Sequence, residues 1–321
     1  MSERGGDAPR ETRWGVLLLG FGGPERPEEV PAFLRRLLRR EPPPALEAEV
    51  TERYRRFGGS PLPAVTRRQR ELLEAELRRR GPGWPVEVGM AYADPSIEEG
   101  LRRLAEAGVR RLVLLSLTPY RSAVSIDEYE RAALEAIDRL GLAMEARRVE
   151  PWHRHPLYLG ALAERLAATL EEVPEGERDG VPVVFSAHSL PRSMVEAGDP
   201  YVRQLEATVR GINLLLGPLN WRLGFQSRGQ ASREPWLEPD VLQVLEELRI
   251  QGHRRVVVHP IGFLADHLET LYDNDVLHRE RARELGLAFH RVPCLNDSPR
   301  LIRLLAEVAV GAASESERKR G

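Results

Sequence analysis

Lysine and cysteine are almost absent from this 321-residue chain. Lys319 is the only lysine, which excludes a Schiff-base, a P-loop and a kinase-type lysine, so cationic chemistry must come from arginine and histidine. Cys294 is the only cysteine, which excludes an internal disulfide, a thiolate zinc site and a cysteine-ligated iron–sulfur cluster. Such cysteine usage is typical of a reducing cytoplasm.

The chain also lacks a long apolar run and a block of basic residues. No stretch approaches the roughly 20 apolar residues of a membrane span, and residues 1–13 are polar and mixed in charge, unlike a secretory signal. The formal net charge is -2, with arginine and glutamate interspersed, so nucleic-acid binding is not expected. These absences predict a cytoplasmic protein without a transmembrane segment.

Short runs rich in valine and leucine alternate with longer stretches of helical periodicity. This alternation is typical of parallel strands buried on both faces and joined by crossover helices. The predicted strands are residues 14–19, 86–92, 111–116, 143–149, 182–187, 221–225, 254–260 and 287–292. Predicted helices include 28–40, 66–80, 96–107 and 239–250.

The two halves of this pattern repeat each other. The first, third, fifth and seventh strands lead into irregular segments, at 20–24, 117–122, 186–191 and 261–267. We therefore predict an α/β protein of two pseudo-duplicated Rossmann-like domains, each a four-stranded parallel sheet flanked by helices. The predicted limits are 14–150 and 151–313, with a disordered tail at 314–321. Ligands of such folds bind outside the carboxyl ends of the strands, where these segments lie.

The turn at 20–24 reads Gly-Phe-Gly-Gly-Pro but does not fit a dinucleotide-binding loop. A G-x-G-x-x-G frame needs its third glycine where Glu25 stands, and Pro24 interrupts the helix entry. The glycines can instead let the backbone approach a flat ligand closely, or form a plain tight turn.

His188 follows the apolar fifth strand. A lone histidine in such a place is most often structural. Its position at the carboxyl edge of a sheet, between Ser186 and Ser189, makes it a candidate proton acceptor, because the ordinary pKa of an imidazole is near ~6.5.

Ionisable residues crowd the start of the helix that follows the seventh strand, at 266–275. His267, Glu269, Asp273 and Asp275 are close enough in sequence to make an acidic ladder along one side of that helix. Carboxylates favoured by the helix dipole are the plain alternative, which explains Asp266 better than Asp273 or Asp275. Oxygen ligands with imidazole suit the transfer of a divalent ion, and no paired-histidine zinc motif is present.

Six sequence blocks in order make the chain resemble the ferrochelatases from Gly15 to about Val310. The blocks are residues 18–24 (Leu-Leu-Gly-Phe-Gly-Gly-Pro), 53–62, 184–191 (Val-Phe-Ser-Ala-His-Ser-Leu-Pro), 198–201 (Gly-Asp-Pro-Tyr), 226–227 with 235–237, and 260–263 with 266–275. The resemblance implies a two-domain chelatase fold that holds a porphyrin in a cleft between the domains.

The resemblance also implies roles for individual residues. His188 and Glu269 match the catalytic pair of the family. Together with Asp273 they also match the residues that bind the metal. In the family, the helix that carries these carboxylates has a π-type widening, which would align them. Which of the pair is base and which is metal ligand stays open. The residues expected to contact the porphyrin are Phe21, Gly22, Arg53, Ser122, Ser125 and Tyr129. Arg53, with Arg39 or Arg40, Ser122 and Ser125, would hold propionates; the alternative for each arginine is an ordinary exposed helix residue.

The segment between Pro24 and Tyr54 favours coproporphyrin III as the substrate, because it is short and polar where protoporphyrin enzymes commonly carry an apolar lip. The sequence of residues 271–275, Leu-Tyr-Asp-Asn-Asp, also resembles the coproporphyrin enzymes more closely. Two departures limit the match: Phe21 replaces a tyrosine that can touch the iron, and Leu277 replaces an acidic residue of an outer metal site.

The predicted function is insertion of ferrous iron, as a substrate, into coproporphyrin III in haem biosynthesis, with no permanently bound cofactor and with transient contacts to neighbouring enzymes of the pathway. The alternatives are a protoporphyrin IX ferrochelatase, a cobalt or nickel chelatase of the same fold, and a non-catalytic haem- or porphyrin-binding protein. A cobalt or nickel chelatase is expected to carry a second histidine close to His188, and none is obvious there.

Overall fold

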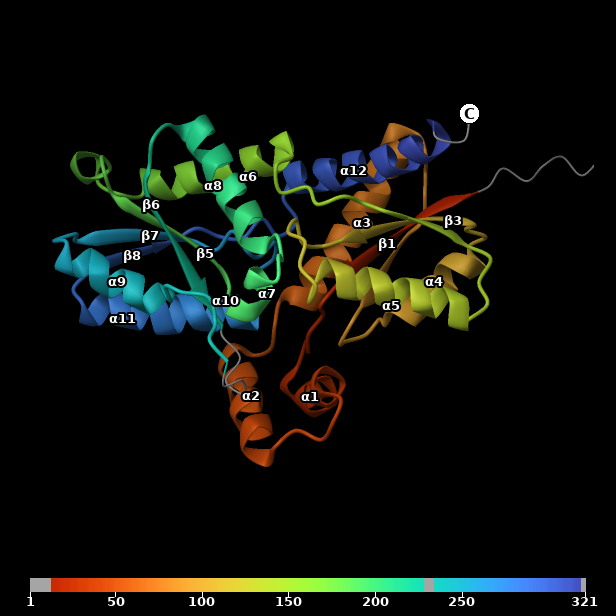
Figure 1. Cartoon of the computed structure of the whole chain (residues 1–321), viewed down its shortest axis with the longest axis horizontal. Coiled ribbons are helices and arrows are strands. Elements are labelled where there is room, and N and C mark those ends of the chain that lie inside the picture. The colour runs from red at the N-terminus through yellow and green to blue at the C-terminus, as the bar shows by residue number, and fades with distance from the viewer. Residues whose placement is uncertain (1–12, 228–233, 319–321) are drawn as a thin grey trace, which may run out of the picture.

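Residues 13–227 and 234–318 are described by the computed structural model of the chain, and they build two parallel sheets (Figure 1). The first has the order β2-β1-β3-β4 and contains β1 (Trp14–Gly20), β2 (Val86–Met90), β3 (Arg111–Ser116) and β4 (Glu145–Arg148). The second has the order β6-β5-β7-β8 and contains β5 (Pro182–His188), β6 (Asn220–Gln226), β7 (Arg255–His259) and β8 (Ala288–Arg291). The identical strand order confirms the predicted duplication, and every predicted strand is present with its ends shifted by at most two residues.

Helices cover both faces of each sheet. Around the first sheet lie α3 (Leu62–Arg80) and α12 (Pro299–Arg318) on one face, and α4 (Ile97–Glu106) and α5 (Ile126–Arg139) on the other. Around the second lie α6 (Pro156–Glu171) and α8 (Tyr201–Leu216) on one face, and α9 (Val241–Ile250) and α11 (Arg279–Glu284) on the other. The short elements η2 (Glu175–Glu177) and α7 (Arg192–Glu196) complete this half.

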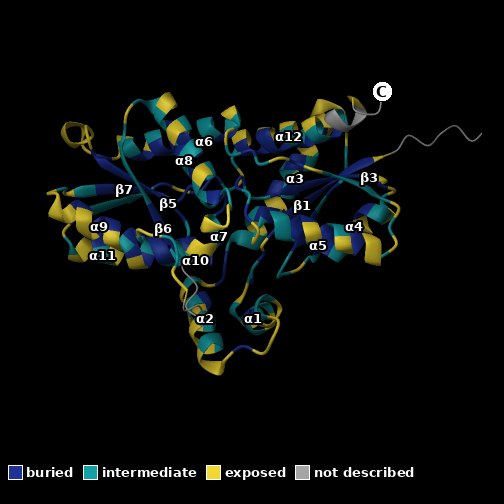
Figure 2. Cartoon of the chain, in the orientation of Figure 1, coloured by how far each residue is buried: buried dark blue, intermediate teal, exposed yellow. Residues whose placement is uncertain are grey.

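One hydrophobic core runs through both halves. Alternate residues of β1, such as Val16 and Leu18, face the same core as Val183 and Phe185 of β5, while Leu17 faces a separate core under α4 and α5. This follows from the two-residue period of a strand. In Figure 2 the central strands β1, β3, β5 and β7 are mostly dark blue and the outer helix faces yellow, as expected for strands buried on both faces.

The C-terminal helix differs from the prediction. Residues 314–321 were expected to form a disordered tail, but α12 continues to Arg318. The Ser314 hydroxyl donates a hydrogen bond to the Val310 carbonyl at 3.0 Å, and apolar residues such as Leu305 and Ala313 anchor the helix in the shared core. Although α12 belongs to the C-terminal half of the chain, it packs on α3 and β3 as well as α6. The domain limits at residue 150 stay a prediction.

A lip protrudes from the first half between β1 and α3 (Figure 1). It consists of η1 (Pro27–Glu29), α1 (Val30–Leu38) and α2 (Pro44–Phe57). The single helix predicted at 28–40 is therefore a 3-10 turn followed by α1, which ends where Arg39 adopts a φ of 52°. Within the described ranges no helix is both long and apolar enough to cross a membrane.

The loop after β7 passes very close to the end of β5 at Gly262. A Cβ atom at this position would lie 2.6 Å from Cα and 2.7 Å from Cβ of Ala187, the residue before His188. The Gly262 N–H donates to the Ser186 carbonyl at 3.1 Å, so the approach is fixed by a hydrogen bond. Glycine is therefore needed here for space.

We predict that Gly262→Ala lowers the free energy of unfolding by about 1–3 kcal/mol, because the added methyl group overpacks the end of β5. Urea unfolding measures the change. Gly176→Ala is the matched control, since a Cβ at Gly176 would meet nothing within 4 Å, and its effect should stay within about 0.5 kcal/mol. Equal stability of the two variants would contradict the prediction.

Candidate active site

His188 is the last residue of β5 and lies beside Gln226 of β6 in the sheet. Its Nδ1 lies 2.5 Å from the Ser189 carbonyl oxygen. Because a carbonyl oxygen only accepts, Nδ1 carries a hydrogen and the lone pair of the neutral ring is on Nε2. The side chain is 37% exposed.

Glu269 reaches His188 from the first turn of α10 (Leu268–Tyr272). Its Oε1 lies 3.6 Å from Nε2 of His188, and its side chain is 42% exposed. Burial opposes the charged form of both groups, but their mutual attraction outweighs it. The pKa of His188 is raised, and the His188 and His267 rings lower the pKa of Glu269 to about 2. The structure thus brings the predicted catalytic pair together.

His267 caps the start of α10. Its Nδ1 accepts a hydrogen bond from the Thr270 N–H at 3.1 Å, so the neutral ring carries its hydrogen on Nε2. That Nε2 lies 3.9 Å from Oε2 of Glu269. Burial lowers the pKa of His267 despite the nearby carboxylate, so this ring is a neutral donor facing Glu269.

The helix widens directly after α10. Residues Asp273–His278 form the π-helix η3, which confirms the widening that the resemblance implied. Asp273 is only 9% exposed, and its Oδ2 accepts hydrogen bonds from Nε2 of Gln226 at 3.2 Å and from the Ser227 hydroxyl. Burial, aided by the Glu269 charge, raises the pKa of Asp273 to about 6. Asp273 is therefore the carboxyl group of this site that holds a proton most readily.

The expected acidic ladder is shorter than the sequence suggested. Asp275 does not join Glu269 and Asp273, because Nε of Arg291 lies 3.0 Å from its Oδ1 and Arg279 pairs with it at 3.2 Å. Residues two apart on a helix do not share a face, so Asp275 turns away from the face that carries Asp273.

The lip closes over α10 from the other half of the chain. Tyr54 of α2 and Leu268 share a small core, and the Leu268 N–H lies 3.3 Å from the Ser60 hydroxyl oxygen. The guanidinium of Arg53 stacks 4.7 Å above the Tyr272 ring, and Arg53 also pairs with Glu49 of its own helix. Arg53 is therefore half-buried beside α10, the helix that carries Glu269.

Phe21 and Gly22 follow β1 at the edge of the first sheet. The Phe21 side chain is 42% exposed and packs against Tyr92, with ring centroids 4.8 Å apart. Gly22 has a φ of +80°, and a Cβ there would lie 2.8 Å from Cβ of Met90 and of Ala93. An exposed ring beside a turn that only glycine fits is compatible with the predicted contact to a flat ligand.

Three predicted porphyrin contacts are placed less favourably. Tyr129 is 5% exposed in the core between α5 and the first sheet, so its prediction as a ligand contact is wrong. Ser122 is 2% exposed, and its hydroxyl donates to Asp199 at 2.8 Å, which ties the two halves of the chain together instead of facing a ligand. Ser125 is partly exposed at the N-cap of α5, with its hydroxyl 3.5 Å from the Tyr120 and Ser122 carbonyls.

Among the described residues no three His, Cys, Asp or Glu side chains are placed to hold one metal ion together. His188, Glu269 and Asp273 are thus not assembled as a three-ligand site. His188 and Glu269 converge, whereas Asp273 is occupied by Gln226 and Ser227.

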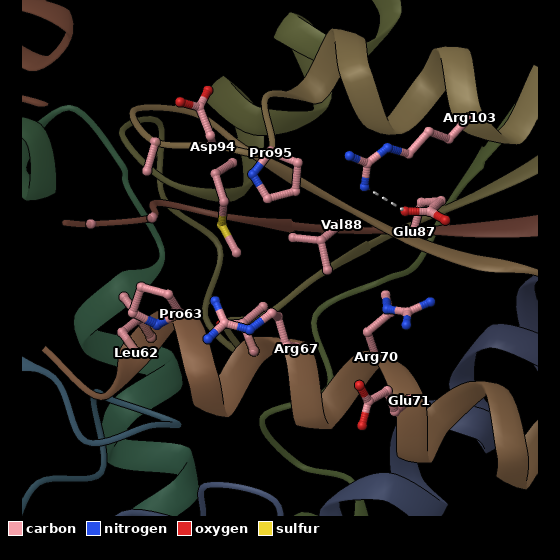
Figure 3. Close-up of a pocket in the computed structure, with 15 residues that line it drawn as sticks. Leu62, Pro63, Arg67, Arg70, Glu71, Glu87, Val88, Asp94, Pro95 and Arg103 are labelled. Atoms are coloured by element: carbon pink, nitrogen blue, oxygen red, sulfur yellow. Dashed lines mark ion pairs between the residues drawn. The ribbon is translucent and has the colours of Figure 1, made fainter. Parts of the chain in front are cut away.

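A cavity lies elsewhere, between α3 and β2 (Figure 3). It has a volume of about 290 Å³ and touches Gly22 and Gly23 at one end. Its charged residues are paired: Arg103 lies 3.5 Å from Glu87, and Arg67 makes two hydrogen bonds to Glu25. At the predicted pair, by contrast, a partly exposed histidine and a partly exposed carboxylate shift each other's pKa, a combination that is frequent at functional sites.

Sequence reasoning did not assign roles to Gln226 and Ser227. They belong to a matching block, but their contact with Asp273 joins residues 47 positions apart, and no local pattern reports such a contact. Ser227 has a φ of 60°, which is uncommon for a residue other than glycine. Strain of this kind is frequent at functional sites, but only a structure reveals it.

Comparison with known proteins identifies the family. The ferrochelatase family model matches residues 13–312. The chain belongs to the ferrochelatase family. Ferrochelatases insert iron into a porphyrin, and this family member is accordingly an enzyme of haem biosynthesis.

Two curated ferrochelatases match nearly the whole chain. A ferrochelatase of Deinococcus radiodurans is 37% identical over 305 residues, covering 94% of this chain and 96% of the relative. A coproporphyrin III ferrochelatase of Oceanobacillus iheyensis is 32% identical over 309 residues, covering 95% and 98%. Among solved structures, SirB from Bacillus subtilis with Fe3+ has a TM-score of 0.59 at 12% identity, covering 95% and 97%, which confirms the chelatase fold alone.

We predict a pH-dependent stability from the His188–Glu269 pair of this ferrochelatase. Because the pKa of His188 is raised in the folded state, its contribution to the free energy of unfolding is fully present below its unfolded pKa of 6.5. This contribution is lost as pH rises through its folded pKa. The lowered pKa of Glu269 means that its contribution is full above 4.5 and is lost as pH falls toward about 2.

The difference in free energy of unfolding between wild type and Glu269→Gln should therefore peak between about pH 4.5 and 6.5 and shrink above it. Urea unfolding across this range measures it. Glu284→Gln is the control, because Glu284 pairs with Arg281, which keeps its charge throughout. A Glu269→Gln difference that stays constant from about pH 5 to 9 would disprove the coupling.

Proposed function

We propose that this enzyme inserts ferrous iron into coproporphyrin III to give coprohaem, with His188 and Glu269 as its catalytic pair. The observation that carries the catalytic assignment is the 3.6 Å approach of Nε2 of His188 to Oε1 of Glu269, with both side chains accessible. An imidazole lone pair beside a carboxylate can accept protons and can replace water on a ferrous ion.

The reaction requires two protons to leave. As Fe2+ enters, each of two pyrrole N–H groups gives up its proton, and four nitrogens bind the ion. The lone pair on Nε2 of His188 accepts the first proton, the imidazolium releases it to solvent water, and the lone pair then accepts the second; the Glu269 carboxylate stabilises the imidazolium each time it forms. His267 orients the Glu269 carboxylate from the other side, with its Nε2 3.9 Å from Oε2 of Glu269.

The surface of the lip supports a substrate with four carboxylates. Throughout residues 25–60, all of them described, no large hydrophobic residue is exposed; the apolar side chains of Val30, Leu34 and Phe33 are turned toward Tyr54 and Leu268. The arginines at 35, 36, 39 and 40 are exposed; Arg36 pairs with Asp94 at 3.0 Å and Arg39 with Glu128 at 3.5 Å. Coproporphyrin III ferrochelatases are among the relatives at 32–34% identity, which supports the same substrate.

The remaining assignments belong to the same proposal. Asp273 assists by taking or passing on protons, and Phe21, Gly22 and Arg53 contact the porphyrin. Iron is a substrate and not a resident cofactor, the enzyme works in the cytoplasm, and its contacts with neighbouring haem-pathway enzymes are transient.

We predict faster metallation of coproporphyrin III than of protoporphyrin IX under anaerobic conditions with ferrous iron. The lip exposes charged side chains, and its large apolar side chains are at most partly exposed, so kcat/KM for coproporphyrin III should be at least about 10-fold higher than for the less polar porphyrin, equivalent to about 1.4 kcal/mol. Loss of porphyrin fluorescence gives the rate. A preference for protoporphyrin IX would support the protoporphyrin alternative, and faster reaction with cobalt or nickel would support the other chelatase class.

We predict that His188→Ala lowers kcat by about 10²–10⁴-fold, the range for removal of a general base. Glu269→Gln should bind coproporphyrin III, as measured by fluorescence quenching, but metallate it far more slowly. His253→Ala and Glu284→Gln, which lie outside the site, should keep wild-type rates. If the wild type binds porphyrin without metallating it, the protein is a porphyrin-binding protein and the proposal is wrong.

A further inference from the structure

Arg291 is not one of the two residues of the proposed catalytic pair, but it contacts both ends of the segment that carries Glu269. This arginine is the last residue of β8, and its side chain is only 15% exposed. Its Nη1 lies 2.6 Å from Oδ1 of Asp266, just before α10, and its Nε lies 3.0 Å from Oδ1 of Asp275, inside η3. Glu269 and Asp273 lie between these two anchors.

We propose that Arg291 is a positioning residue, which fixes the rotation of the α10–η3 helix so that Glu269 faces His188. This inference rests on the proposed function. Residues i and i+4 share a helix face, so Glu269 and Asp273 lie on one side, whereas Asp275 lies off that side. Holding Asp275 on β8 therefore aims the opposite side of the helix at His188.

The anchor continues into the other half of the chain. The Asn296 side-chain amide donates to Oδ2 of Asp266 at 2.8 Å, and its Oδ1 accepts from the Asp266 N–H at 2.8 Å. Nε2 of Gln69, a buried residue of α3, donates to the Asn296 carbonyl at 2.6 Å. Hydrogen bonds therefore link the start of the α10–η3 helix to both β8 and α3.

Arginine suits this position because its planar fork offers several donors in fixed directions. Two of its nitrogens reach two different carboxylates, which the single ammonium of lysine cannot do with the same geometry. Buried charge-assisted hydrogen bonds of this kind are directional and stronger than neutral ones. Removing the guanidinium leaves Asp266 with Asn296 but frees Asp275 from β8.

The test combines anaerobic kinetics, with ferrous iron and coproporphyrin III, and hydrogen–deuterium exchange. Arg291→Gln should lower kcat by about 10–100-fold, the scale of a misplaced catalytic group, while KM for the porphyrin stays within about twofold. Exchange over residues 266–278 should become faster, with α9 unchanged. Asp275→Asn, a milder variant that removes one anchor, should shift both readouts in the same direction.

Arg281→Gln is the matched control, because Arg281 also bridges two carboxylates, Glu246 and Glu284, on the same half of the chain. It should leave kcat and exchange over 266–278 unchanged. Wild-type exchange in Arg291→Gln, or faster exchange with unchanged kcat, would overturn the inference. An inactive wild type would refute the proposed function, whereas the exchange data would still decide whether Arg291 anchors the helix.

Discussion

The contact between His188 and Glu269 joins the end of a strand to the first turn of a helix, and the chemistry of the site depends on it. Each group alone would be driven by burial toward its neutral form. Side by side, at 3.6 Å, they raise the pKa of the imidazole and lower that of the carboxylate. The surrounding structure serves to hold that distance: Gly262 sets the end of β5, and Arg291 with His267 sets the start and rotation of the helix.

Two carboxyl groups one helical turn apart, Glu269 and Asp273, have pKa values that their surroundings shift in opposite directions. Glu269 faces two imidazoles and has a pKa of about 2, whereas Asp273 is buried behind it beside Gln226 and Ser227 and has a pKa of about 6. A pair of titratable groups whose environments separate their pKa values can divide acid and base roles between them. Near neutral pH, Glu269 is thus the permanent anion, and Asp273 is the group whose proton can come and go.

Much of the fold could be predicted from the sequence because burial on both faces of a parallel sheet leaves a local pattern. All eight strands produced one, and the order of the motifs reproduced the duplication. The same logic could have excluded Tyr129: Ile126, Tyr129, Ala133 and Ala136 recur at helical spacing and form the buried face of α5. The resemblance outweighed this periodicity, and the structure favours the periodicity.

Contacts between distant segments left no such pattern. Ser122 looked like an available hydroxyl because nothing nearby in sequence indicates Asp199, its partner 77 positions away. Asp275 looked like part of the acidic ladder because its partner Arg291 lies 16 positions later in the chain, at the end of β8, and no local pattern indicates that contact. The polar and charged residues at 314–318 looked like a disordered tail. They continue α12, whose apolar residues before them, such as Leu305 and Ala309, are anchored in the core.

The shared core also constrains how a ligand can reach the pair. Both sheets contribute to one hydrophobic core, and α12 packs on elements of each half, so separating the halves would expose apolar area at a cost of about 25 cal/mol per Å². The lip contacts α10 through Tyr54 and Leu268, the Ser60 hydroxyl, the Arg53–Tyr272 stack and the Phe57–Tyr272 ring contact. The lip therefore lies directly beside α10, the helix that carries Glu269.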